Sequence, residues 1–276
     1  MTSVHPSASV GPEVELGQGV EIGPRCEIAG PVRLGDGVRI LGNVYLRGPL
    51  TIGAGTIVYP FACIGFSAQD VKFKPGDPTP GVQIGENCTL REHITIHAAT
   101  KPDHPTTIGS RVFMMVNSHV GHDAVVGNDV TLVNNACLAG HTVVQDRATL
   151  SGNTAVHQFC RVGRLAFISG GVVASCDVPP FSIISARNTI GSVNVIGLRR
   201  SGLSNAEITA VRQAYRLAFH GKTLPRAQLL ELLDELAGSS EAVAELAEFV
   251  RTAKRPLCRM PRRHEDQEVA LDTAAP

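Results

Sequence analysis

The chain has 276 residues, enough for one large domain or two of ordinary size. Its 25 basic and 25 acidic residues balance at a sequence pI of about 7.1, which argues against a nucleic-acid-binding protein because that class normally carries a basic excess. Aromatic residues make up only 4% and tryptophan is absent, whereas there are 28 glycines, a composition that favours small repeated turns over a core of large side chains.

The first ten residues, MTSVHPSASV, lack a basic region followed by an apolar stretch, so no signal peptide is visible. No run of residues is long and apolar enough to predict a membrane span. The seven cysteines show neither a C-x-x-C pair nor the spacing of a secreted disulfide framework, which indicates reduced thiols. We therefore expect a cytoplasmic protein.

An aliphatic residue recurs at every sixth position from Val4 to Ile64. The same period resumes from Ile84 to Ile96, and again from Ile108 to Ile168, where Met114 takes one of the positions. Neither a helix nor a simple strand gives a period of six. Each repeat predicts one short strand and one corner, and three repeats close a triangular coil of about 18 residues. We predict a mainly β protein with a parallel β-helix over residues 1–182.

Two other positions of the repeat carry small residues. Glycine often follows the aliphatic residue, as at Gly23 and Gly109, and we expect it to supply the positive φ of a tight corner. Four positions after the aliphatic residue comes a small or β-branched side chain that should point inward. Cys26, Cys88 and Cys160 stand at this position, which predicts that they are small core residues.

Two segments interrupt the period, at about residues 66–83 and 98–107. The first is rich in proline, glycine and charge, and the second contains TKPDHPT. Loops that leave a repeat scaffold commonly carry function, although a tolerated insertion is the simpler explanation of either.

The period of six ends after Asp177-Val-Pro-Pro, and residues 183–203 are interpreted as a connector. Residues 204–255 have helical periodicity and predict a C-terminal α-helical domain. Its first helix should begin with a capping box of Ser204 and Glu207 and end at Gly221. Two more helices are expected at about 225–237 and 241–254, and the polar tail 260–276 is expected to be disordered.

Histidines gather on one edge of the predicted prism. On a coil of about 18 residues, His122 and Gly140 share a phase, His141 lies one residue further on, and His157 one residue short of two turns. His119 lies three residues before His122 on the same coil. Solvated corner residues would explain one such histidine better than they explain three.

Such a column can catalyse acyl transfer. A neutral histidine such as His122 can take the proton of a hydroxyl that attacks a thioester, while Asp123 holds the ring. A backbone N–H at Gly140, one coil further, could bind the developing oxyanion. A zinc site is the alternative, because imidazoles are good zinc ligands and trimeric β-helix carbonic anhydrases bind zinc through histidines.

The segment Asn117-Ser-His-Val-Gly-His-Asp123 resembles the N-x-H-x-x-H-D core of the UDP-N-acetylglucosamine O-acyltransferase family, of the hexapeptide-repeat class. Other segments agree in the same order, and the resemblance reaches about Arg259. They are Gln69-Asp-Val-Lys72, Arg91-Glu-His-Ile-Thr-Ile-His97, Leu138-Ala-Gly-His141, Thr154-Ala-Val-His-Gln-Phe-Cys160, Asp177-Val-Pro-Pro180 and Gly197-Leu-Arg-Arg200.

The resemblance implies a left-handed β-helix and a homotrimer with clefts between its subunits. It also implies transfer of a (3-hydroxy)acyl chain from acyl carrier protein to the 3-position of UDP-N-acetylglucosamine, the first step of lipid A biosynthesis. The donor carries its own phosphopantetheine, so no bound cofactor and no metal are implied. Four basic residues are candidates for docking the acidic carrier: Arg199, Arg200, Arg212 and Arg216.

The family's roles pass to matching positions of this chain. His122 is implied as general base, Asp123 as its partner and Gly140 as the oxyanion donor. The implied substrate-binding residues are Asp70 and Lys72 on a neighbouring subunit's loop, His119, His141, His157 and Gln158 in the cleft, Gly170 as a ruler of acyl length, and Asn194 and Arg200 at the nucleotide end. Gly170 would leave the acyl groove open for a longer chain, although a plain corner glycine explains it equally well.

The resemblance weakens at the nucleotide end. The chain is a little shorter than the family pattern between Asn188 and Asn194, Ile196 stands where glutamate is common, and Ser201 stands where a second arginine is common. N-acylation of a UDP-3-amino sugar by the same mechanism is therefore an alternative.

Other readings fit less of the chain. The N-acyltransferase of the same pathway carries an added N-terminal domain, whereas the repeats here begin at Val4. Acetyl-CoA-dependent hexapeptide enzymes do not usually end in three helices. A zinc-dependent hydratase and a non-catalytic scaffold are the alternatives from other classes.

Overall fold

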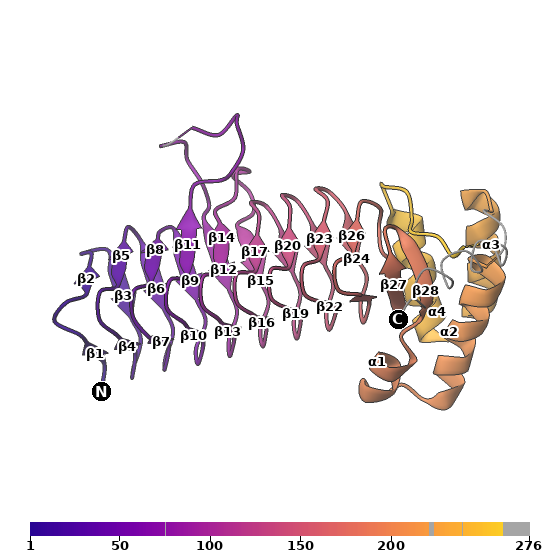
Figure 1. Cartoon of the computed structure of the whole chain (residues 1–276), viewed down its shortest axis with the longest axis horizontal. Helices are drawn as coiled ribbons and strands as arrows, with labels where there is room; N and C mark the ends of the chain where they lie inside the picture. The colour runs from indigo at the N-terminus through magenta and orange to yellow at the C-terminus, as the bar shows by residue number, and fades with distance from the viewer. Residues whose placement is uncertain (75, 221–223, 239, 262–276) are drawn as a thin grey trace, which may run out of the picture.

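The computed structural model of the chain describes residues 1–74, 76–220, 224–238 and 240–261. These residues form a long triangular prism of short strands with helices at its C-terminal end (Figure 1). Three sheets make the faces of the prism, and the chain visits them in turn.

Among the described residues, the first face has eleven strands and the other two have nine and eight. The first face consists of β1 (Ser3–Val4), β4 (Glu21–Ile22), β7 (Arg39–Ile40), β10 (Ile57–Val58), β13 (Thr89–Leu90), β16 (Phe113–Met114), β19 (Thr131–Leu132), β22 (Thr149–Leu150), β25 (Phe167–Ile168), β27 (Ser182–Ala186) and β28 (Thr189–Val193). The second consists of β2 (Ser9–Val10), β5 (Glu27–Ala29), β8 (Tyr45–Arg47), β11 (Cys63–Phe66), β14 (Thr95–His97), β17 (His119–Val120), β20 (Cys137–Leu138), β23 (Ala155–Val156) and β26 (Val173–Ala174). The third consists of β3 (Val14–Leu16), β6 (Val32–Leu34), β9 (Leu50–Ile52), β12 (Val82–Ile84), β15 (Thr106–Ile108), β18 (Val125–Val126), β21 (Val143–Val144) and β24 (Arg161–Val162).

The register confirms the predicted repeat. Parallel partners pair one coil apart, as Met114 pairs with Leu132 and Val120 with Leu138. The aliphatic residues of the period form the interior, where Leu132 and Leu138 are fully buried. Cys26, Cys88 and Cys160 are 2% exposed or less, as expected, and burial raises the pKa of the Cys160 thiol to about 11.

The expected role of the glycines was wrong, with the exception of Gly65. Gly23 and Gly109 have no positive φ; the left-handed residue is the third after the aliphatic one, as at Asn135. These glycines are needed because the coils stack closely. A Cβ at Gly23 would lie 2.4 Å from the Leu41 carbonyl oxygen, a separation that side chains do not tolerate.

The two predicted loops leave the prism where expected and meet at their bases. The first runs from β11 to β12 and projects from the body (Figure 1), and the second runs from β14 to β15. The Gly81 carbonyl accepts the backbone N–H groups of Ala99, at 3.2 Å, and Thr106, at 3.1 Å. The Thr79 hydroxyl donates to the Ala99 carbonyl at 2.5 Å. The first loop therefore fixes the path of the second.

The prism extends beyond the boundary predicted at residue 182. The expected connector 183–203 contains a hairpin, β27 and β28, and the short helix α1 (Val195–Arg200). Strand β27 pairs in parallel with β25, so it continues the first face. The antiparallel return of β28 has no place in a period of six, which is why the repeat does not predict it.

The C-terminal helices are α2 (Asn205–Ala218), α3 (Arg226–Ala237) and α4 (Glu241–Thr252). Only half of the predicted capping box forms: the Ser204 hydroxyl accepts from the Glu207 N–H at 3.2 Å. The Glu207 carboxylate instead accepts from the Ser240 hydroxyl, at 2.6 Å, and from the Ala242 N–H, so it supports the start of α4. Gly221 and residues 262–276 lie outside the described residues. Within the described segments no helix has the length and hydropathy needed to cross a membrane.

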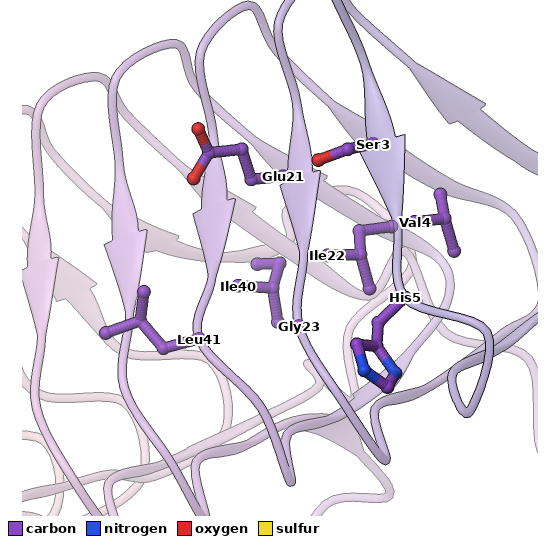
Figure 2. A pocket seen from close by; sticks show the side chains of 8 residues that line it. All are labelled: Ser3, Val4, His5, Glu21, Ile22, Gly23, Ile40 and Leu41. Atoms are coloured by element: carbon purple, nitrogen blue, oxygen red, sulfur yellow. The ribbon is translucent and has the colours of Figure 1, made fainter.

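The first face has a recess at its first three strands. Figure 2 shows this recess, lined by residues of β1, β4 and β7 and by the residues that follow these strands. Val4 is 44% exposed there, whereas Ile22 and Ile40 of the next coils are buried. The only titratable side chains that line it are His5 and Glu21.

Candidate active site

His122 and Asp123 form a hydrogen-bonded pair at the corner that follows β17. The His122 Nδ1 atom lies 2.7 Å from Asp123 Oδ2, and the side chains are 12% and 5% exposed. Because a carboxylate only accepts, Nδ1 carries the proton and Nε2 of the neutral ring keeps its lone pair. Asp123 has a φ of 58°, the left-handed conformation that the repeat requires at this position and that aspartate tolerates.

Gly140 lies directly beneath the free edge of the His122 ring. A Cβ at Gly140 would lie 2.6 Å from Nε2 and 2.7 Å from Cε1, so only glycine admits the imidazole here. The Gly140 N–H finds no acceptor among the described residues, whereas its carbonyl accepts from Phe159 N–H at 3.2 Å. The coil phase thus brings the His122 ring against the backbone of Gly140.

His141 closes the other side of the pair. Its ring meets that of His122 edge to face, with centroids 5.0 Å apart, and its Nε2 atom is 3.7 Å from Asp123 Oδ2. Burial and the neighbouring His122 lower the pKa of His141, and the nearby Asp123 opposes the shift. Phe159 stacks on His141 with centroids 4.5 Å apart. Sequence reasoning missed Phe159, although it shares the phase of Asp123 and His141.

The second loop holds the Asp123 carboxylate. The Thr100 hydroxyl donates to Oδ2 at 2.7 Å, and the backbone N–H groups of Thr100 and Lys101 donate to Oδ1 at 3.1 and 3.0 Å. Burial alone would raise the pKa of Asp123, but these hydrogen bonds and that from His122 outweigh burial and lower it. Sequence reasoning missed Thr100. The second loop has no repeat, so its sequence does not predict which of its residues will contact Asp123.

His119 lies on the same coil, away from the pair. Its Nδ1 atom is 2.7 Å from the Thr95 hydroxyl, and its ring meets His97 edge to face at 5.4 Å. Burial, with the neighbouring His97 and His122, lowers the pKa of His119 to about 4. A neutral imidazole is therefore the resting form of His119.

The other predicted substrate residues make no hydrogen bond to this cluster among the described residues, although the Asp70 charge is near enough to oppose the lowering of the His141 pKa. His157 and Gln158 are exposed, and His157 Nδ1 lies 3.2 Å from the Gln158 carbonyl oxygen. Asp70 and Lys72 lie on the projecting first loop, where the Asp70 carboxylate accepts from the Lys72 N–H at 2.9 Å.

Gly170 is exposed and has no positive φ. A Cβ there would meet only the Gly152 carbonyl oxygen, at an ordinary 3.5 Å. The backbone therefore does not require glycine at this corner, and the role of Gly170 as a ruler of acyl length stays a prediction.

Asn194 and Arg200 lie at the two ends of α1, at the C-terminal end of the prism (Figure 1). The Asn194 amide donates to the Leu165 carbonyl at 2.8 Å and accepts from the Gly197 N–H at 2.9 Å. This side chain therefore has a structural role as the cap of α1. Arg200 is exposed, and its binding role stays a prediction.

His122, Asp123 and His141 are also the one group of the described residues whose donor atoms approach metal-binding spacing, within 4.8 Å of one another. Zinc would need these atoms at about 2.0–2.2 Å from a common centre. The Asp123 oxygens already accept from Thr100, Lys101 and His122. This donor set suits a hydrogen-bonded acid–base site better than a zinc site.

Comparison with known proteins agrees with this geometry. Residues 177–258 match the family model of UDP-N-acetylglucosamine O-acyltransferase, domain 2. An acyl-[acyl-carrier-protein]–UDP-N-acetylglucosamine O-acyltransferase of Pseudomonas putida is 42% identical over 94% of this chain and 100% of its own length. The enzyme of the same name from Sinorhizobium fredii is 40% identical over 72% of this chain and 74% of its own.

Solved structures extend the agreement to the whole fold. The UDP-N-acetylglucosamine acyltransferase of Francisella novicida superposes with a TM-score of 0.90 at 31% identity and 99% coverage of both chains. That of Bacteroides fragilis gives 0.88 at 34% identity, covering 93% of this chain and all of the other. The left-handed β-helix implied by the sequence motifs is thereby confirmed, and the chain belongs to the UDP-N-acetylglucosamine O-acyltransferase family.

Proposed function

We propose that the chain transfers a 3-hydroxyacyl group from acyl carrier protein to the 3-hydroxyl of UDP-N-acetylglucosamine, the first step of lipid A biosynthesis. Membership of the family supports the reaction. The observation that carries the chemistry is His122: its Nδ1 is hydrogen-bonded to Asp123, and its ring packs against the backbone of Gly140, whose N–H has no acceptor among the described residues.

In this reaction His122 Nε2 takes the proton of the sugar hydroxyl as its oxygen attacks the thioester carbonyl carbon. Asp123 stabilises the imidazolium through Nδ1, and the Gly140 N–H donates to the oxyanion of the tetrahedral intermediate. The intermediate then collapses with cleavage of the C–S bond. The departing sulfur takes the proton from Nε2, which leaves the neutral base for the next turnover.

The substrate and assembly roles rest on family resemblance. We expect a cytoplasmic homotrimer in which Asp70 and Lys72 of one subunit reach the sugar nucleotide in a neighbour's cleft. The projection of the first loop away from its own prism supports such a reach (Figure 1). The phosphopantetheine thiol belongs to the donor, so the chain needs no bound cofactor.

Docking of the acidic carrier is expected on the exposed basic residues of α1 and α2. Arg212 and Arg216 line one recess with His220, beside β28. Charge reversal at Arg212 and Arg216 should raise KM for the acyl carrier protein substrate and leave kcat unchanged. An unchanged KM would refute the docking surface.

The test is to incubate purified protein with UDP-N-acetylglucosamine and 3-hydroxyacyl carrier proteins of several chain lengths, and to follow product by mass. A parallel reaction with the UDP-3-amino sugar addresses the alternative, which the exposed Ile196 at the nucleotide end keeps open. The His122→Ala variant is the control. Ester product from the wild type supports the proposal, whereas amide product alone would replace O-acylation by N-acylation.

A further inference from the structure

One residue of the second loop, Thr100, donates to the Asp123 carboxylate through its side chain. Thr100 donates to Asp123 through both its hydroxyl and its backbone N–H. Its hydroxyl reaches Oδ2, the same oxygen that accepts from His122 Nδ1, and both contacts are 2.7 Å long. Of the two contacts from Thr100 to Oδ2, the one from the hydroxyl is shorter than the one from the backbone N–H, and a mutation can remove it.

The donors divide between the two carboxylate oxygens. Oδ1 is held at 3.0–3.1 Å by the backbone N–H groups of Thr100 and Lys101, which any sequence would supply. Oδ2 is held by His122 Nδ1 and the Thr100 hydroxyl, with the Thr100 N–H a longer 3.2 Å away. Because the terminal torsion of an aspartate is soft, the orientation of Oδ2 depends on these donors.

A competing partner stands close to the same oxygen. His141 Nε2 is 3.7 Å from Asp123 Oδ2, a distance that a small rotation of the carboxylate would close. The Thr100 hydroxyl approaches Oδ2 at 2.7 Å and so opposes that rotation. Without it, Oδ2 can turn towards His141 and weaken its bond to the base.

Hydrogen bonds hold the loop on both sides of this contact. Before Thr100, the Ala99 N–H donates to Gly81 and the Ala99 carbonyl accepts from Thr79. After it, the fully buried Thr106 accepts from the Asp123 N–H at 2.8 Å through its hydroxyl. Gly81 cannot be replaced here, since a Cβ would lie 1.8 Å from the Pro49 carbonyl oxygen. The second loop therefore holds Asp123 in place through hydrogen bonds to its carboxylate and its backbone N–H.

We propose that Thr100 is a positioning residue for acyl transfer, whose hydroxyl holds Oδ2 of Asp123 so that His122 keeps its Nδ1 proton and directs Nε2 over Gly140. This inference rests on the proposed function, in which His122 is the base. It assigns the second loop to the orientation of that base, through Asp123.

The test compares Thr100→Val, which keeps the shape and loses the hydroxyl, with Thr100→Ser, which keeps the hydroxyl. We expect kcat of Thr100→Val to fall by about 10- to 100-fold, the worth of one charge-assisted hydrogen bond, with KM for both substrates within about twofold. Thr100→Ser should restore most of kcat. The matched control is Thr107→Val, whose hydroxyl donates to the Pro105 carbonyl and does not touch Asp123; it should keep wild-type kcat.

A second measurement separates this proposal from the proposed function. Spectra of ¹⁵N-histidine-labelled protein should show His122 protonated at Nδ1 in the wild type and Thr100→Ser, and a mixture of tautomers in Thr100→Val. If the wild type acylates no UDP-sugar, the reaction is wrong and these spectra alone decide the role of Thr100. Wild-type kcat and tautomer in Thr100→Val would overturn the inference, and so would equal losses in the valine and serine variants, which would assign the effect to packing.

Discussion

Two clusters of half-buried and buried polar groups differ in how they are paired: the histidine edge (His122, Asp123, Gly140, His141) and the C-terminal junction (Arg161, Arg164, Asp177, Tyr215), where the helices meet the prism. At the junction each of these side chains has a hydrogen-bond partner in the protein. The Arg161 guanidinium donates to Asp177, Thr252 and the Phe249 carbonyl and lies 4.2 Å over the Phe249 ring.

The histidine edge is satisfied differently. Asp123 accepts from four donors, yet His122 Nε2 and the Gly140 N–H have no partner among the described residues. The paired groups of the junction hold the helices on the prism, whereas the unpaired groups of the histidine edge are available to hydrogen-bond a substrate. Changes at the edge should therefore lower activity with little change in stability, and changes at the junction should do the reverse.

The largest effect is expected for His122→Ala. Loss of the general base should lower kcat by about 1,000-fold, within the range that positioned acid–base groups contribute. The midpoint of thermal unfolding should stay within a few degrees, because the side chain has only one hydrogen-bond partner among the described residues. Steady-state assays and calorimetry of the same preparations check both values. Retention of a tenth of the wild-type kcat would remove His122 from the role of base.

Gly140→Ala should come next. The new methyl group would occupy a point 2.6 Å from His122 Nε2, so the imidazole must turn away from the N–H of the oxyanion site. We expect a loss of about 100-fold in kcat, typical of one disturbed oxyanion interaction. Gly152→Ala is the matched control, since its methyl group would meet nothing closer than an ordinary 3.6 Å contact. Equal activity of the two variants would contradict the assignment of Gly140.

The junction should respond in the opposite sense. Arg161→Met leaves Asp177, whose side chain is 1% exposed, as a buried charge without its ionic partner. Breaking such a pair costs about 3 kcal/mol of unfolding free energy or more, while kcat at a temperature where the variant is folded should be unchanged. Denaturant titration measures the loss. Adding Asp177→Asn should recover part of it by removing the stranded charge, and no recovery would show that the pair is not the source.

The parts of the molecule also differ in what their sequence predicts. In the prism, residues about eighteen positions apart lie next to each other on successive coils. The spacing of His122, Gly140 and His141 therefore predicted that they lie close together. The loop from β14 to β15 has no period, and its contact from Thr100 to Asp123 depends on hydrogen bonds to another loop. At the junction, Asn194 matches a family motif, but its two contacts, with Leu165 and Gly197, belong to the fold.

The smallest expected effect concerns stability at acid pH and comes from His119. Its pKa of about 4 in the folded chain lies below its ordinary value of 6.5, chiefly because it is buried. Between those values the unfolded chain binds a proton that the folded chain does not, so the unfolding free energy falls as the pH is lowered from about 6.5 to about 4. The full shift corresponds to a loss of at most about 3 kcal/mol.

His119→Gln removes this titration and should flatten the decline, even if the variant is less stable than the wild type at neutral pH. Denaturant titrations of both proteins at several pH values between about 4 and 7 measure the two slopes. Parallel curves would show that the burial of His119 is not a source of acid sensitivity, and the difference between edge and junction would then rest on activity alone.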